Sequence, residues 1–170
     1  MRPWTMAVWI GVCSGVLLLL SAPAATQEGP PKELDTLRAM LGKWACDAKT
    51  TGAGGHAFKA GFELVTEFDG HTFVERYWEE KSSDHPQAFK AIFLWTYDPA
   101  TQRYVRNGLD HLGRRNSASA TGWHGDSWVW DREGLRVPLL CRPSNGIDFT
   151  TDIQKDGQWL TVVEATCKKL

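Results

Sequence analysis

The 170-residue sequence lacks the compact motifs that identify common metal, phosphate and nucleophile sites. It contains no Cys-x-x-Cys and no His-x-x-x-His, so the ligand spacing of a zinc site is missing. It contains no Gly-x-Ser-x-Gly, and the glycine-rich stretch 52–55 has no lysine with which to bind a phosphate. We therefore expect no metal and no cofactor, and we assign no catalytic residue.

An excess of charge of either sign is also absent. The 19 Lys and Arg residues balance 20 Asp and Glu residues, for a formal net charge of −1. The densest basic spot is the dipeptide Arg114-Arg115. Nucleic acids and anionic membrane surfaces are bound by much larger basic patches, so we expect neither as a partner.

Long apolar runs are absent except near the N-terminus. Met6 to Leu20 is an apolar run of about 15 residues, short of the roughly 20 that span a bilayer. Arg2 precedes the run, and small residues follow it, with cleavage expected after Ala24 or Ala25. We predict a signal peptide at 1–25, export to the periplasm or medium, and no membrane span after cleavage. An uncleaved anchor is the alternative.

The rest of the chain shows two hydrophobic periods. After a polar leader at 26–32, Leu34, Leu37 and Leu41 predict a short amphipathic helix over 32–41 that ends at Gly42. Apolar residues then alternate with polar ones, which is the period of strands. The strands expected from this alternation are 43–50, 57–69, 71–81, 87–97, 103–109, 115–122, 127–132, 135–140, 147–154 and 158–168.

About ten short strands joined by short turns predict an all-β domain over 33–170. Turn dipeptides such as Asp69-Gly70, Gly125-Asp126 and Asp156-Gly157 separate the strands, and no long crossover segment is present. Each strand should therefore pair with the next in an antiparallel, up-and-down, lipocalin-like barrel, which removes free edges by closing. A two-sheet sandwich is the alternative.

Three cysteines remain after signal cleavage: Cys46, Cys141 and Cys167. Spacing alone permits any pairing, but a closed barrel makes its first and last strands neighbours. Cys46 lies in the first expected strand and Cys167 in the last, so we predict a disulfide between them. Closing a loop of this length contributes roughly 4–5 kcal/mol on the chain-entropy estimate.

Four motifs carry a resemblance to a known group. They are Gly42-Lys43-Trp44-Ala45-Cys46, Val74-Glu75-Arg76-Tyr77, Gly122-Trp123-His124-Gly125-Asp126 and Thr166-Cys167-Lys168-Lys169. In order and spacing the chain resembles exported bacterial proteins with a calycin-like, lipocalin-like domain of uncharacterised function. The resemblance implies a barrel with a lumen and an end-strand disulfide, and it brings no reaction. Haem-binding barrels of the nitrobindin type are similar in outline, but they need a late histidine and none follows His124.

Aromatic residues are the candidates for binding a ligand inside such a barrel. Nine tryptophans occur, and seven of them follow Ala25. Trp128 and Trp130 point the same way from one strand, Trp95 points inward from another, and Tyr77 lies on a third. Ligand sites are mostly apolar and aromatic, so we predict that these four residues line the lumen. Ordinary core packing is the alternative.

One charged residue must also point into the barrel. Glu75 and Arg76 are adjacent in an aromatic strand, and consecutive strand residues face opposite sides. An inward Arg76 would bind a ligand carboxylate, and we include it among the predicted binding residues. An inward Glu75 would pair with a base on a neighbouring strand, and a purely structural salt bridge is the alternative.

We therefore expect a carrier that holds a small, partly apolar or aromatic molecule in the lumen. An acid-base enzyme, such as a hydrolase or isomerase, is the second hypothesis. It requires His111 or His124 beside a carboxylate in a cleft. A protein-interaction module is the third, and an exposed aromatic patch outside the barrel would favour it.

Overall fold

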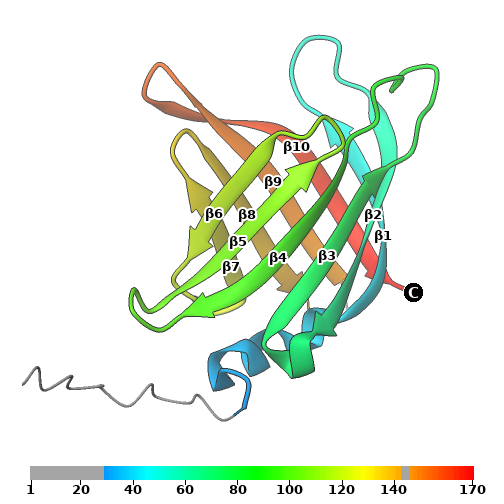
Figure 1. Cartoon of the computed structure of the whole chain (residues 1–170). Helices are drawn as coiled ribbons and strands as arrows, with labels where there is room; N and C mark the ends of the chain where they lie inside the picture. Colours follow the sequence, from blue (N-terminus) through cyan, green and yellow to red (C-terminus); the bar gives the residue numbers. More distant parts are fainter. Residues whose placement is uncertain (1–28, 143–145) are drawn as a thin grey trace, which may run out of the picture.

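The computed structural model describes residues 29–142 and 146–170 (Figure 1). The predicted signal peptide and residues 26–28 of the leader lie outside the described residues. The described chain forms two short 3₁₀ helices and ten strands, with ends that differ from the predicted ones by a few residues. The elements are η1 (Lys32–Met40), β1 (Gly42–Thr50), β2 (Ala57–Glu67), η2 (Phe68–Gly70), β3 (Thr72–Glu79), β4 (Lys90–Asp98), β5 (Arg103–Asp110), β6 (Arg115–Ala120), β7 (Ser127–Arg132), β8 (Leu135–Arg142), β9 (Gly146–Lys155) and β10 (Gln158–Lys169).

The strands form one closed, up-and-down antiparallel barrel. Each strand pairs with the next along the chain, and β10 pairs with β1 to close the sheet. The fold prediction is confirmed, and the sandwich alternative is wrong because one continuous sheet includes every strand. The pairing of β6 with β7 is the sparsest, with Ser119 opposite Asp131 as its one registered pair.

The disulfide prediction is confirmed at the seam of the barrel. Cys46 and Cys167 are direct cross-strand partners and form a disulfide that joins residues 121 positions apart. Cys141 is a free thiol, half-buried against the core. Burial, together with the charge of Asp126, raises the pKa of this thiol, so the reactive thiolate form is disfavoured.

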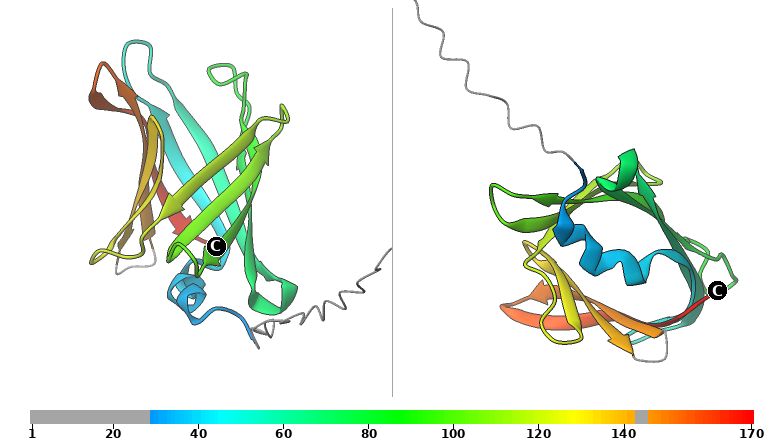
Figure 2. Two further views of the ribbon diagram at one scale, coloured as in Figure 1. Left: turned by 60° about the vertical axis from the view of Figure 1, so that its left-hand side comes forward. Right: turned by 90° about the horizontal axis from the view of Figure 1, so that it is seen from below.

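The helix η1 closes one end of the barrel, as seen from below in Figure 2. It is a 3₁₀ helix, and its buried residues are Leu34, Leu37 and Met40. The spacing of three matches the three residues per turn of a 3₁₀ helix. Met40 therefore occupies the inward position that the α-helical reading gave to Leu41. No helix in the described ranges is long and apolar enough to cross a membrane.

Side-chain hydrogen bonds to its backbone carbonyls fasten η1 to the barrel. The Trp44 indole donates to the Met40 carbonyl at 2.9 Å, and the Tyr104 hydroxyl donates to the Glu33 carbonyl at 2.9 Å. The Trp123 indole donates to the Thr36 carbonyl at 3.2 Å. These bonds satisfy carbonyls of a helix whose ends leave such groups free. The end of the barrel that η1 covers is therefore fixed in place.

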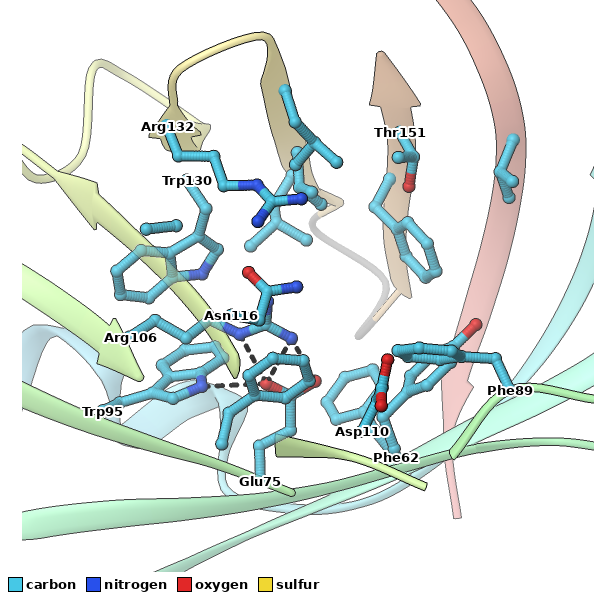
Figure 3. A pocket seen from close by; sticks show the side chains of 18 of the residues that line it. Phe62, Glu75, Phe89, Trp95, Arg106, Asp110, Asn116, Trp130, Arg132 and Thr151 are labelled. Atoms are coloured by element: carbon cyan, nitrogen blue, oxygen red, sulfur yellow. Dashed lines mark hydrogen bonds and ion pairs between the residues drawn. The ribbon is translucent and has the colours of Figure 1, made fainter. Parts of the chain in front are cut away.

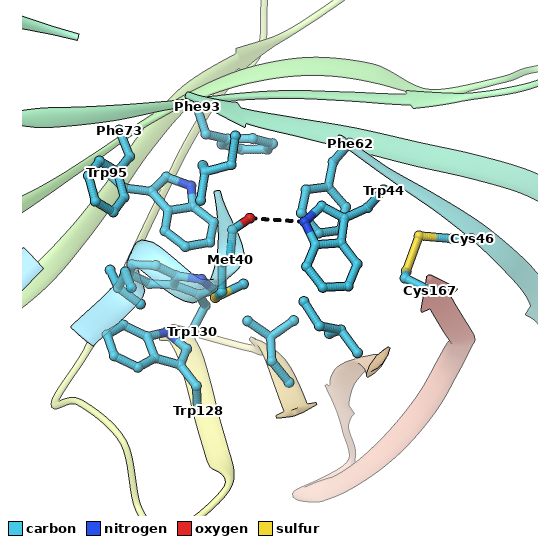
Figure 4. Packing of buried hydrophobic residues seen from close by; sticks show 14 of the residues in the cluster. Met40, Trp44, Cys46, Phe62, Phe73, Phe93, Trp95, Trp128, Trp130 and Cys167 are labelled. Atoms are coloured by element: carbon cyan, nitrogen blue, oxygen red, sulfur yellow. Dashed lines mark hydrogen bonds between the residues drawn. A yellow bond between two sulfur atoms is a disulfide. The ribbon is translucent and has the colours of Figure 1, made fainter. Parts of the chain in front are cut away.

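Large side chains fill the interior next to η1 (Figure 4). Trp128 packs edge-on against Trp130 and Tyr104, with ring centroids 5.3 and 4.6 Å apart. Trp95 contacts Trp130 in the same way at 4.9 Å. Burial of a large apolar side chain contributes about 1.5–3 kcal/mol, so this layer is a principal source of stability. It also forms the floor of the space above it.

Candidate ligand-binding lumen

A cavity of about 620 Å³ occupies the rest of the barrel interior. It begins at Met40 beside η1 and reaches Arg114 and Arg132, next to the turns at the opposite end. Its walls are mainly aromatic and aliphatic side chains, interrupted by a few polar groups. This size and composition are typical of sites for small molecules.

Three of the five predicted binding residues line this cavity. Tyr77, Trp95 and Trp130 belong to its wall. Trp128 also points inward, but it is 0% exposed and lies within the packed layer. Arg76 is exposed on the outer face of β3. The placement of Arg76 in the lumen is wrong, because the other side of the strand, carrying Phe73, Glu75 and Tyr77, faces inward.

The inward charged residue is Glu75, which is 5% exposed. Its Oε2 accepts hydrogen bonds from Trp95 Nε1 and Arg106 Nε, each at 2.8 Å, and its Oε1 accepts one from Arg106 Nη2 at 3.1 Å. The Arg106 guanidinium also lies 3.3 Å from the centre of the Phe93 ring. A buried carboxylate needs such partners, because unpaired burial is costly. The basic partner of Glu75, Arg106, therefore comes from β5 and not from the adjacent strand β4, where a partner was expected.

A second carboxylate, Glu79, lies near the mouth and is also fully engaged. Its Oε2 accepts from His85 Nε2 at 2.7 Å and from the Phe89 amide at 2.8 Å, while Oε1 accepts from the Tyr77 hydroxyl at 3.1 Å. His85 in turn contacts His56, with Nδ1 and Nε2 2.8 Å apart. Burial, with Glu79 adding to it, raises the pKa of Tyr77 well above its usual range, so this phenol stays a donor.

The third carboxylate of the cavity wall, Asp110, is held by its own turn. It accepts from the backbone amides of Leu112 at 2.9 Å and Arg114 at 3.0 Å, and from Arg114 Nε at 2.6 Å. Burial opposes its ionisation, but the hydrogen bonds from Arg114 and Leu112 outweigh that effect and lower the pKa of Asp110. Asp110 is therefore an ionised residue with its hydrogen-bonding capacity largely used.

Several donors of the cavity wall have no partner within the described part of the chain. The indole nitrogen of Trp130 is buried without a hydrogen bond. Arg132, two residues further along β7, lines the cavity with no acidic partner among residues 29–142 and 146–170. Figure 3 shows Asn116 between Arg106 and Arg132, on the same side of the cavity. This wall offers hydrogen-bond donors and positive charge.

The histidines proposed for acid-base chemistry lie elsewhere. His111 Nδ1 accepts from the Lys90 amide at 3.3 Å, and His124 Nε2 contacts Thr121 Oγ1 at 3.0 Å. Neither is paired with a carboxylate in the described structure. The histidine–carboxylate contact on the cavity rim joins His85 to Glu79 instead. Among the described residues, no cluster of three or more potential ligands could hold a metal ion.

Sequence reasoning missed most of the polar residues of the lumen. Arg106, Asn116 and Arg132 all lie at inward positions of strands whose ranges the sequence predicts. Extending the alternation of Trp128 and Trp130 by two residues reaches Arg132, and extending that of Tyr104 reaches Arg106. The signal was therefore available for these two. His85 lies in the loop between β3 and β4, where no periodicity indicates the direction of a side chain.

Comparisons with known proteins find the fold and not the family. No protein-family model matches the sequence, and no curated protein matches it. Among solved structures, the chain is similar to the protein of the "Crystal Structure of Rv2717c from M. tuberculosis". The TM-score is 0.64 at 10% sequence identity, covering 83% of this chain and 99% of that chain. At this identity the likeness concerns the architecture alone: the chain is a closed, ten-stranded, antiparallel up-and-down barrel.

Proposed function

We propose that this protein is an exported carrier that binds a small, partly apolar molecule in the lumen of its barrel. The observation that carries the proposal is the cavity of about 620 Å³ between the aromatic floor and the mouth. A barrel of this size can fill its interior with side chains, and here the packing stops at the level of Trp95 and Trp130. Tyr77, Trp95 and Trp130 are the predicted binding residues that border the space.

Physical reasons favour an apolar ligand body over water in this cavity. Phe62, Phe93, Trp95 and Phe149 present ring carbon to the space, and water there gains few hydrogen bonds. Displacing such water by an apolar group is favourable by about 25 cal/mol per Å² of apolar surface buried. The fixed floor and the disulfide across the seam preorganise the site, which lowers the cost of binding.

Export supports the same proposal from a different direction. An intramolecular disulfide such as Cys46–Cys167 is typical of proteins that work outside the reducing cytoplasm. We propose that residues 1–25 are removed and that the mature protein acts in the periplasm or medium. Terminal sequencing of the protein from its own host tests this. We expect a mature N-terminus at Ala25 or Thr26, and an intact Met1 would contradict the proposal.

The interaction-module hypothesis is the second candidate, favoured by the outer surface of β4 and β5. Ile92, Leu94 and Leu109 are 53%, 43% and 53% exposed there. The patch is aliphatic rather than the aromatic patch that the sequence hypothesis required. Light scattering of the purified mature protein over a wide concentration range tests self-association through it, with Ile92→Lys as the variant that should abolish it.

Native mass spectrometry of the mature protein, purified gently from its own host, tests the carrier proposal. We expect an added mass that leaves under mild activation, and we expect uncharged N-phenylnaphthylamine to bind the stripped protein with enhanced fluorescence. The contrary result is a bare polypeptide mass together with no response to the probe.

A further inference from the structure

We infer that the lumen selects an anionic ligand: an apolar, ring-containing body with a carboxylate, sulfonate or phosphate group that faces the wall formed by Trp130, Arg132, Asn116 and Arg106. The inference rests on the proposed function and adds the chemistry of the ligand. It follows from which hydrogen-bonding groups of the lumen are already used and which are spare.

The negatively charged groups of the lumen already have hydrogen-bond partners within the protein. Glu75, Glu79 and Asp110 are the carboxylates of the cavity wall, and each accepts three hydrogen bonds from the protein itself. Each also has a cationic or potentially cationic partner, which is Arg106, His85 or Arg114 respectively. A cationic ligand would have to displace these partners and leave them without their hydrogen bonds. The free-energy cost of doing so exceeds the gain from the new ion pair.

Several hydrogen-bond donors of the lumen, by contrast, have no acceptor in the described structure, and they lie on the same side of the cavity. In the described ranges the Trp130 indole N–H has no acceptor, although the residue is 1% exposed. Leaving a buried donor unsatisfied is unfavourable, so an acceptor brought by a ligand is stabilised there. Arg106 uses Nε and Nη2 on Glu75, and its Nη1 has no partner in the described part of the chain.

The position of Arg132 adds full positive charge to the same wall. Arg132 follows Trp130 at the next inward position of β7, about 7 Å along the strand. Asn116 reaches toward the same space from β6, as Figure 3 shows. Asp131, the acidic neighbour of Arg132, faces the opposite side of the strand. The guanidinium is thus available for a bidentate contact with an anion.

These positions also orient the ligand. The aromatic rings of Trp95, Phe93 and Phe62 lie around Met40, toward the floor (Figure 4), whereas Arg132 ends β7 beside the turn at the mouth. The apolar body therefore enters first and packs on the rings. The anionic group stays along the β6–β7 wall, between the Trp130 indole and the Arg132 guanidinium.

A matched pair of fluorescent probes tests the inference. Anilinonaphthalene sulfonate and uncharged N-phenylnaphthylamine share one aromatic body and differ by the sulfonate. We expect the anionic probe to bind the mature protein about 10-fold more tightly. Arg132→Met should weaken the anionic probe about 10-fold and leave the uncharged probe within about 2-fold. Trp130→Phe also changes the apolar wall, so it is judged by the ratio of the two affinities: the anionic probe should lose about 3-fold or more in affinity relative to the uncharged probe. Lys168→Met, on the exposed outer face of β10, removes the same charge and should change neither affinity.

The outcomes separate this inference from the proposed function. Preference for the anionic probe, reduced by Arg132→Met and not by Lys168→Met, supports the inference. Equal binding of the two probes, unchanged by Arg132→Met, overturns it and leaves the carrier proposal standing. Absence of binding by either probe overturns the carrier proposal and this inference with it.

Discussion

Arg106 on β5 donates hydrogen bonds to both carboxylate oxygens of Glu75 on β3, across the intervening strand β4. The pair lies at the base of the cavity, where Glu75 is buried and the Arg106 side chain is 13% exposed. Because the ends of this bridge come from different hairpins, it ties the cavity wall together. It also places a fixed dipole beside the ligand space.

Breaking this pair from one side should be more damaging than removing both charges. Arg106→Met leaves Glu75 buried with Trp95 as its remaining partner, and we expect a loss of about 3–5 kcal/mol in the free energy of unfolding. The double variant Glu75→Gln with Arg106→Met should lose clearly less. Urea denaturation of the three proteins measures both values. A loss below about 1 kcal/mol for Arg106→Met would show that the pair is solvated.

The barrel could be predicted from the sequence because its signals are local. Phe58, Ala60 and Phe62 mark one face of β2 by themselves, and short turns without a long crossover segment make each strand pair with the next. Closure then makes the first and last strands neighbours, and the pairing of Cys46 with Cys167 followed from it.

The site was predicted less well because its properties are not local. Alternation fixes that Trp128 and Trp130 share a face, but it does not say how deep each lies along the barrel axis. The helix η1 decides that, since its residues Leu34, Leu37 and Met40 fill the lower end. Likewise, the choice between Glu75 and Arg76 depends on Arg106, which becomes a neighbour only when β3, β4 and β5 are assembled.

Removal of the seam disulfide should lower stability without changing the fold. Cys46→Ser with Cys167→Ser opens a loop spanning 121 positions, and we expect a loss of about 4–5 kcal/mol. Chemical denaturation with and without a thiol reductant measures it: the reductant should destabilise the proteins that keep the disulfide and leave the double variant unchanged. Cys141→Ser is the control, because that thiol is unpaired. An equal loss of unfolding free energy for Cys141→Ser would contradict the stabilising role of the Cys46–Cys167 disulfide.

We expect Asp152, which is buried on the outer side of the barrel, to contribute to the free energy of unfolding in a way that depends on pH. Burial opposes its ionisation, yet hydrogen bonds from Arg136 at 2.8 Å and Thr161 at 2.9 Å lower the pKa of Asp152. A carboxyl whose folded-state pKa is depressed stabilises the protein above its unfolded-state pKa of about 3.9. That stability is lost as the pH falls through the folded-state value.

Asp152→Asn tests this contribution directly. We expect the variant to be less stable than the wild type by about 1–3 kcal/mol at pH 6, with the difference shrinking as the pH falls below about 4. Unfolding curves recorded across this range measure the difference. Asp131→Asn, at an exposed site, is the control and should show no such trend. A difference that stays constant with pH would refute the assignment.

The lumen itself is tested most directly by filling it. Leu135 and Leu140 belong to the same strand, β8, but Leu135 lines the cavity and Leu140 is 48% exposed on the outer face. Titration of N-phenylnaphthylamine into Leu135→Trp, Leu140→Trp and the wild-type protein compares one substitution on the two sides of the barrel wall. We predict that Leu135→Trp weakens binding at least about 10-fold, while Leu140→Trp leaves it unchanged. Equal affinities for all three proteins would contradict the claim that the ligand lies inside the barrel.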